Sequence, residues 1–114
     1  AVWLDYASAD LAAAKRLVET HGTIAAYHAH QAAEKGLKAL QIDREGDHER
    51  THDLVRLYHD LDVPEEYRSV LEDLNPADTA ARYPDAPDVE LERPDETLDA
   101  VEELLTWIRR RSNE

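Results

Sequence analysis

The most constraining feature of this sequence is a helical segment, from about Thr23 to Gln41, whose apolar face carries mostly small side chains. The face is built from residues at helical spacing: Ala25, Ala29, Ala32, Ala33, Gly36, Leu37 and Leu40. Small side chains let two helix backbones approach closely, which would compensate for the roughly 1 kcal/mol that Gly36 costs in a helix interior relative to Ala. We therefore expect this segment to be the central helix of a helical protein.

Apolar residues repeat with the period of a helix along the rest of the chain too. The first such segment runs from about Trp3 to Thr20, and we expect Gly22 to end it in the left-handed conformation. A third helix is predicted after Thr51, which would cap it. A fourth begins at Pro64, a residue that suits the first turn of a helix.

The last third of the chain predicts one short and one long helix. A helical turn that reaches Ala81 follows Asn75-Pro76, and residues 82–93 are typical of a long loop. The last helix begins at Pro94, with acids in its first turn and the arginines 109–111 in its last turn, which complements the helix dipole. Because no segment alternates in the manner of a strand, we predict an all-α fold and one domain over residues 1–114.

The charge balance is strongly acidic. The chain has 26 acids against 13 Lys and Arg, a formal net charge of −13, and only three of those bases are Lys. Acidic surfaces with little Lys resemble those of halophilic proteins, so we expect a salt-adapted protein. The sign of the charge disfavours general affinity for nucleic acids.

Composition also bears on the compartment. No stretch approaches the roughly 20 apolar residues that span a bilayer, and no basic-then-apolar leader is visible, so we expect no membrane association. The absence of Cys excludes a disulfide framework and a thiolate metal site, and it fits a reducing cytoplasm. We predict a cytoplasmic location.

Four stretches of sequence together resemble one known family. They are WLDYASADLAAAKRL from Trp3, AYHAHQAAEKGLKAL from Ala26, THDL from Thr51 and ARYPD from Ala81. In this order and with these gaps they resemble the HEPN family (higher eukaryotes and prokaryotes nucleotide-binding), over nearly the whole chain. The resemblance implies an up-down four-helix bundle core with one or two extra short helices, and a homodimer.

Two of the three lysines share one stripe of the second helix. Gln31, Lys35 and Lys38 lie at i, i+4 and i+7, with Glu34 beside them. One interpretation is that the ammonium groups hold a phosphate or a carboxylate of a partner. The other is a solvated helix face on which Glu34 and Lys38 form an i,i+4 pair, which contributes about 0.2–0.5 kcal/mol.

Two later motifs complete the candidate binding site. His52 could face a cleft as an acid–base or hydrogen-bonding group, or could simply belong to a helix cap. Arg82 could bind a phosphate, or could fix its loop to a carboxylate such as Glu34. Pro84 restricts Tyr83 to extended geometry. The predicted binding residues are Gln31, Glu34, Lys35, Lys38, His52, Arg82 and Tyr83.

The histidines do not predict a metal site by their spacing. His28 and His30 are two residues apart, so they diverge on a helix. His48 and His52 have i,i+4 spacing, but a predicted loop–helix boundary lies between them, and no HExxH motif is present. We therefore predict no metal and no cofactor.

Many HEPN proteins are ribonucleases with an Arg followed, after four to six residues, by a His. The match to that spacing here is Arg16-LVET-His21, at the end of the first helix, with Leu17 where a polar residue usually follows the Arg. We interpret this match as coincidental and predict no catalytic residue.

The resemblance implies a function in partnership. We expect a nucleotide- or partner-binding subunit, associated with a minimal nucleotidyltransferase in a toxin–antitoxin-like pair and able to bind a nucleotide or RNA. The alternatives are a metal-independent endoribonuclease toxin and a dimeric helical scaffold without catalysis. The poorly placed Arg–His match favours the binding subunit and the scaffold over the endoribonuclease. The lysine stripe favours the binding subunit over the scaffold.

The acidic composition leads to a testable prediction about stability. Thirteen excess negative charges repel one another at low ionic strength. At molar salt the Debye length falls to about 3 Å, so the repulsion is screened. The melting temperature should rise between low and molar KCl in thermal melts followed by circular dichroism. A melting temperature that falls with added salt would contradict the salt-adaptation hypothesis.

Overall fold

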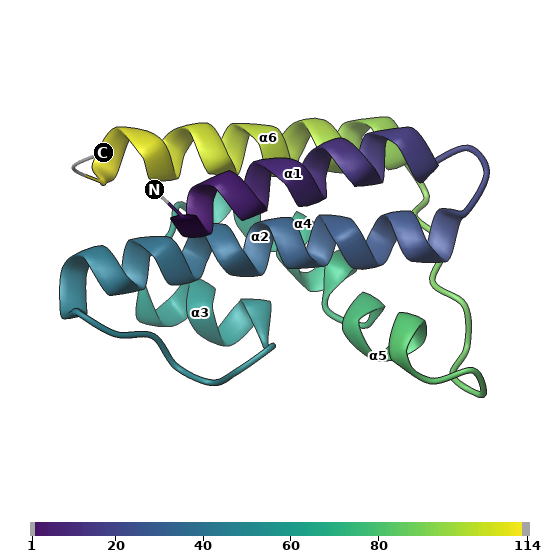
Figure 1. Ribbon diagram of the computed structural model, residues 1–114, viewed down its shortest axis with the longest axis horizontal. Helices are drawn as coiled ribbons and strands as arrows, with labels where there is room; N and C mark the ends of the chain where they lie inside the picture. Colours follow the sequence, from purple (N-terminus) through teal and green to yellow (C-terminus); the bar gives the residue numbers. More distant parts are fainter. Residues whose placement is uncertain (1, 113–114) are drawn as a thin grey trace.

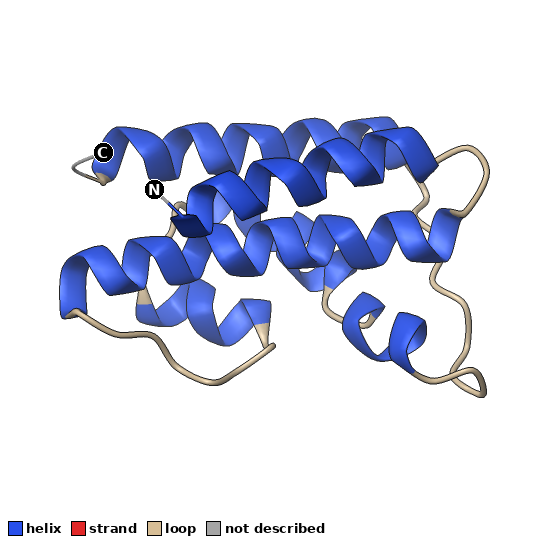
Figure 2. Ribbon diagram, in the orientation of Figure 1, coloured by secondary structure: helices blue, strands red, loops and turns tan. Residues whose placement is uncertain are grey.

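The computed structural model describes residues 2–112, so the ends of the predicted 1–114 domain lie outside the described residues. Within them the structure is helical and contains no strand, which confirms the all-α prediction (Figure 2). The elements, in chain order, are α1 (Val2–Leu17), α2 (Gly22–Glu45), α3 (Leu54–Asp60), the 3₁₀ turn η1 (Glu65–Tyr67), α4 (Arg68–Leu74), α5 (Ala77–Arg82) and α6 (Pro94–Arg111).

The long helices α1, α2 and α6 lie side by side along the longest axis of the molecule (Figure 1). The η1–α4 segment is the fourth member of the bundle, because α4 packs against both α2 and α6, and α3 and α5 are the extra short helices. The predicted four-helix core with additional short helices is therefore confirmed. None of the helices in residues 2–112 is long and apolar enough to cross a membrane.

The central element is α2, as the small-residue face predicted. It packs against α1, α3, α4, α5 and α6. Its buried residues lie on most of its circumference rather than on one stripe, because neighbours cover it on several sides. They are Ala25, Ala26, Ala29, His30, Ala32, Ala33, Glu34, Gly36, Leu37, Lys38, Leu40 and Gln41.

Gly36 marks the close approach of α2 to α6. A Cβ atom at this position would lie 2.5 Å from Leu105 Cδ2 and 3.2 Å from Ile108 Cδ1. Both of those side chains are buried in the core. The absence of a side chain at Gly36 therefore creates the space that two α6 side chains fill.

The interior is formed largely by leucine. Apolar side chains from α1, α2, α3, α4 and α6 meet in one contiguous core. Fully buried members include Leu4, Leu37, Leu40, Leu54, Leu57, Leu71, Leu74, Leu104 and Ile108. The stripes predicted for the third, fourth and last helices contribute to this core.

The prediction about Gly22 was wrong. Gly22 is the first residue of α2, and the Gly with a positive φ, 84°, is Gly46. The backbone N–H of Gly46 donates to the Ile42 carbonyl at 2.8 Å and closes α2. The helix extends beyond the predicted Gln41 to Glu45, because Gly46 is the first Gly after Gln41 and takes the left-handed conformation that ends a helix.

The predicted starts of the third and fourth helices also shift. Asp53, not Thr51, caps α3, and its carboxylate accepts from the backbone N–H groups of Val55 and Arg56. A charged acceptor at the N-terminus of a helix also interacts favourably with the helix dipole. Pro64 lies just before η1, and the α-helix begins only at Arg68.

The Gly36 contact generates a prediction about stability. Gly36→Val would push two methyl groups against Leu105 and Ile108, and overpacking of this kind typically lowers the free energy of unfolding by about 1–3 kcal/mol. The matched control is Gly22→Val, since a Cβ at Gly22 meets nothing within 4 Å. That control should change stability by less than about 0.5 kcal/mol. Urea denaturation measures both, and equal effects of the two substitutions would contradict the packing account.

Candidate functional site

The candidate site is organised by α2, whose polar side chains are less exposed than those of a free helix face. Glu34 and Lys38 are each only 4% exposed, although both are charged. The sequence placed them on a polar face, opposite the small apolar residues. The structure buries them because the short helices α3, α4 and α5 contact α2, and these helices come from a later part of the chain.

The Glu34 carboxylate is shared by two basic side chains. Lys38 Nζ donates to Oε2 at 3.0 Å, and His52 Nδ1 lies 2.9 Å from Oε1. Because an ionised carboxylate only accepts, the Nδ1 atom of His52 must carry the proton. The His52 side chain is 47% exposed, so its ring is held from inside by Glu34 and remains accessible to solvent.

A second contact fixes the segment that carries His52. His30 Nε2 lies 3.0 Å from the backbone carbonyl oxygen of His52, and this nitrogen therefore donates. His30 is fully buried, and its Nδ1 atom has no hydrogen-bond partner. Burial lowers the pKa of His30, against the opposing influence of Glu34 and Asp78. Burial of the ring therefore favours its neutral form.

The start of α3 is locked from the other side by Asn75. Its side-chain oxygen accepts from the Leu54 N–H at 2.8 Å, and its amide nitrogen donates to Asp53 Oδ1 at 3.0 Å. The hydrogen bond from Asn75 lowers the pKa of Asp53, which also accepts two backbone N–H groups of α3. The chain is thus anchored at His52 itself and at the two residues that follow it.

Arg82 reaches the site from the end of α5. Its Nη2 atom lies 3.4 Å from His52 Nε2, and its Nε atom lies 3.4 Å from Asp78 Oδ1. Gln31 Nε2 donates to the same Asp78 oxygen at 3.5 Å. Arg82 therefore pairs with a carboxylate of its own helix, not with Glu34, the structural partner that the sequence suggested.

Tyr83 follows Arg82 and begins the long loop. Its backbone is extended, with φ −120° and ψ 118°, as Pro84 predicted. Its side chain is 55% exposed. An exposed aromatic ring therefore lies next in sequence to the Arg82 guanidinium.

Lys35 does not belong to this cluster. Its Nζ atom donates to Asp10 Oδ2 of α1 at 2.6 Å, while His28 Nδ1 lies 3.1 Å from the other oxygen of Asp10. The ammonium group also lies 5.7 Å from the centre of the Tyr6 ring. The predicted lysine stripe thus divides, with Lys35 directed to α1 and Lys38 to Glu34.

Most of the predicted site residues do come together. The structure joins Gln31, Glu34, Lys38, His52 and Arg82 through direct contacts, either to one another or through Asp78. Sequence reasoning missed His30, Asp78 and Asn75. His30 had one local signal, its i,i+4 spacing from Glu34, whereas Asp78 and Asn75 had none.

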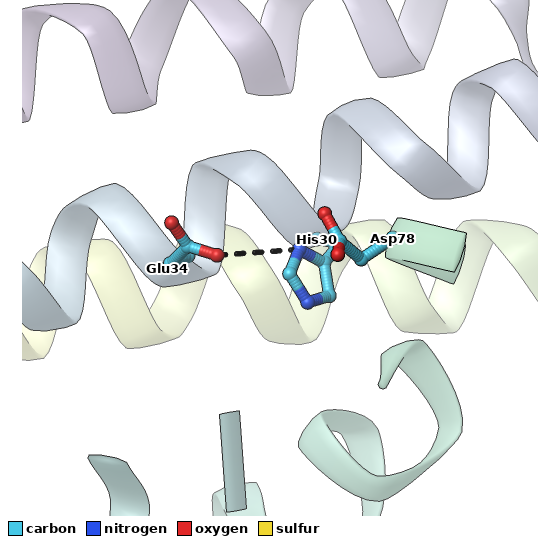
Figure 3. Close-up of side chains that lie close together, drawn as sticks. All are labelled: His30, Glu34 and Asp78. Atoms are coloured by element: carbon cyan, nitrogen blue, oxygen red, sulfur yellow. Dashed lines mark ion pairs between the residues drawn. The ribbon is translucent and has the colours of Figure 1, made fainter. Parts of the chain in front are cut away.

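Three of these groups also form a set that could hold a metal ion. His30, Glu34 and Asp78 each offer one ligand atom, and these atoms lie within 4.8 Å of one another. Figure 3 shows the His30 ring between the two carboxylates. His30 Nδ1 and Glu34 Oε1 are 3.9 Å apart.

Comparison with known families supports the resemblance seen in the sequence. The pattern of the HEPN domain matches residues 1–111. The chain belongs to the HEPN family. No curated protein matches this HEPN chain.

Two solved structures share its fold. TT1696 from Thermus thermophilus is 26% identical, with a TM-score of 0.76, and the alignment covers 96% of this chain and 94% of that one. ST0689, an archaeal HEPN homologue, is 23% identical, with a TM-score of 0.75 and coverage of 96% and 93%. The helical arrangement of this HEPN domain therefore also occurs in these two solved structures.

The burial of Lys38 generates a prediction. Lys38→Met keeps the length of the side chain but leaves the buried Glu34 carboxylate without its ammonium partner. Breaking a buried pair on one side typically costs about 3–5 kcal/mol. The matched control is Lys15→Met, because Lys15 pairs with Glu102 on the surface, where such a pair contributes at most about 1 kcal/mol. Urea denaturation compares the two, and similar small losses would show that Lys38 is not a structural counter-ion.

Proposed function

We propose that this HEPN protein is the binding subunit of a pair with a minimal nucleotidyltransferase, and that the exposed rim formed by His52, Arg82 and Tyr83 receives a phosphate group. The phosphate would belong to a nucleotide or to RNA. An acidic edge of the partner protein would use the same chemistry.

The geometry of His52 and Arg82 carries this proposal. The Nε2 and Nη2 atoms lie 3.4 Å apart, and both side chains are roughly half exposed. Two nitrogen donors at this separation can contact neighbouring oxygens of one phosphate, provided that His52 takes up a proton at Nε2. Glu34 orients the His52 ring by accepting from Nδ1, and Tyr83 offers a ring on which a base could stack.

The two lysines of the sequence hypothesis have a different part in this proposal. Lys38 is buried against Glu34 and Lys35 is engaged by Asp10, so neither ammonium group is free for a ligand. Lys38 instead positions the carboxylate that holds His52. In this proposal the anion-binding groups are therefore His52 and Arg82, and not the lysines of α2.

The assembly and the surroundings complete the proposal. We propose that the protein acts as a homodimer in a salt-adapted cytoplasm. Molar salt shortens the reach of the distant acids far more than it weakens direct contacts, so a few oriented cations suffice despite the net charge of −13. A small nucleotidyltransferase encoded beside this chain would be the partner to test first.

One observation favours an endoribonuclease as the second candidate. With its Nδ1 proton directed to Glu34, a neutral His52 presents the lone pair of Nε2 beside the Arg82 guanidinium. Such a group could take the proton of a ribose 2′-hydroxyl while Arg82 stabilises the phosphate. Arg16 and His21 have the Arg–His spacing of many HEPN ribonucleases. Both are exposed, Arg16 at the end of α1 and His21 after the turn that follows it.

Binding experiments with Arg82→Ala and His52→Ala test the proposal. ATP and a short single-stranded RNA serve as separate probes, in titrations of the parent protein and of both variants. Each substitution should weaken binding at least tenfold, about 1.4 kcal/mol. The matched control is Arg68→Ala, because Arg68 is similarly exposed and pairs with Glu72 on α4. It should bind as the parent does.

The outcomes separate the candidate functions. Unchanged binding of both probes by Arg82→Ala and His52→Ala would contradict the phosphate rim. Cleavage of the RNA by the parent in the presence of a chelator, lost in His52→Ala and kept in Arg68→Ala, would favour the endoribonuclease. Binding of neither probe by the parent, without cleavage, would leave the dimeric scaffold as the better interpretation.

A further inference from the structure

The unpartnered Nδ1 atom of His30 is the starting point for an inference that goes beyond the proposed function. This atom belongs to a fully buried side chain and has no hydrogen-bond partner. Buried polar atoms almost always have a partner, so an orphan of this kind needs a physical explanation. Two carboxylates lie close to this ring, from Glu34 of α2 and Asp78 of α5 (Figure 3).

The other ring nitrogen determines what Nδ1 can do. His30 Nε2 faces the backbone carbonyl of His52 at 3.0 Å, and a carbonyl only accepts, so Nε2 carries a hydrogen. In the neutral ring the lone pair is therefore on Nδ1, directed toward the carboxylates. A lone pair facing carboxylate oxygens is repulsive unless something positive lies between them. Histidines that bind metals typically donate their second N–H to a backbone carbonyl in this way.

We propose that His30 Nδ1, Glu34 and Asp78 bind one divalent transition-metal ion, either Zn²⁺ or Mn²⁺. An imidazole ligand suits Zn²⁺, and carboxylate ligands suit Mn²⁺, whereas Mg²⁺ and Ca²⁺ prefer oxygen ligands alone. His30 and Glu34 have i,i+4 spacing, which places both ligands on one face of α2. Asp78 would connect this face of α2 to α5.

The distances are compatible with one ion. Zn²⁺ binds its ligand atoms at about 2.0–2.2 Å in tetrahedral geometry, so two ligand atoms of one ion are separated by roughly 3.3–3.6 Å. His30 Nδ1 and Glu34 Oε1 are 3.9 Å apart, a few tenths of an ångström beyond that separation. All three ligand atoms lie within 4.8 Å, so small rotations of the carboxylate side chains would complete the site.

Neighbouring groups already orient both carboxylates. Lys38 binds Oε2 of Glu34, and His52 Nδ1 donates to Oε1, the oxygen that also faces His30. Arg82 and Gln31 both contact Oδ1 of Asp78. Carboxylates that bind metals typically accept hydrogen bonds of this sort from neighbouring side chains. The prediction of no metal rested on the spacing of the histidines in the sequence. That spacing does not reveal a set of one histidine and two carboxylates.

Zinc titration of the protein, free of purification tags and pretreated with a chelator, tests the proposal. Isothermal titration calorimetry with ZnCl₂, repeated with MnCl₂, should show one saturable ion per chain. His30→Asn and Asp78→Asn should each weaken that binding at least tenfold. Two substitutions serve as matched controls. His28→Asn changes a histidine of α2 that pairs with Asp10 of α1, as Lys35 does, and Asp73→Asn changes an exposed acid of α4. Both controls should bind as the parent does.

Nuclear magnetic resonance of the ¹⁵N-histidine-labelled parent keeps the test decisive even where a variant fails to fold. Zn²⁺ should shift the Nδ1 resonance of His30 before those of the other histidines. Any of three results would overturn the proposal. The parent protein could show no stoichiometric site, His30→Asn and Asp78→Asn could retain binding, or the Zn²⁺-induced shifts could be confined to other histidines. A buried water or a proton at Nδ1 would then be the better explanation of the orphan atom. The phosphate rim of His52 and Arg82 would be unaffected.

Discussion

The structure of the site depends on one buried carboxylate, that of Glu34 in the central helix. Burying a charge is costly unless it is paired and hydrogen-bonded. Glu34 meets that requirement with Lys38 on one oxygen and His52 on the other. The pairing has consequences beyond α2, because His52 belongs to the segment before α3. A carboxylate inside the bundle thereby determines how an otherwise irregular segment sits against the central helix.

The fold was accessible from the sequence because it depends on local and repeated signals. Helical periodicity located the core-facing residues, and the small side chains around Gly36 identified α2 as the central helix. Helix ends were less predictable. Asp53 and Thr51 are both suitable caps, and the choice between them depends on Asn75, which lies 22 residues beyond Asp53 in the chain.

The site was only partly accessible, for a related reason. A helical wheel places Lys35 and Lys38 on one polar stripe, but it contains no information about what covers that stripe. Lys38 is buried under elements encoded later, whereas Lys35 turns to Asp10 of α1. Asp78 and Arg82 enter through α5, whose position relative to α2 has no signature in the sequence. The residue types were therefore predictable, and their grouping was not.

The central role of the Glu34–Lys38 pair is tested most directly by a double-mutant cycle of Glu34→Gln, Lys38→Met and the combined variant, measured by urea denaturation. If the two charges compensate each other inside the bundle, removing both leaves no isolated charge, and the combined variant should be more stable than Lys38→Met alone. The coupling free energy should then be on the order of 1–3 kcal/mol. Effects of the two single substitutions that simply add would contradict the account.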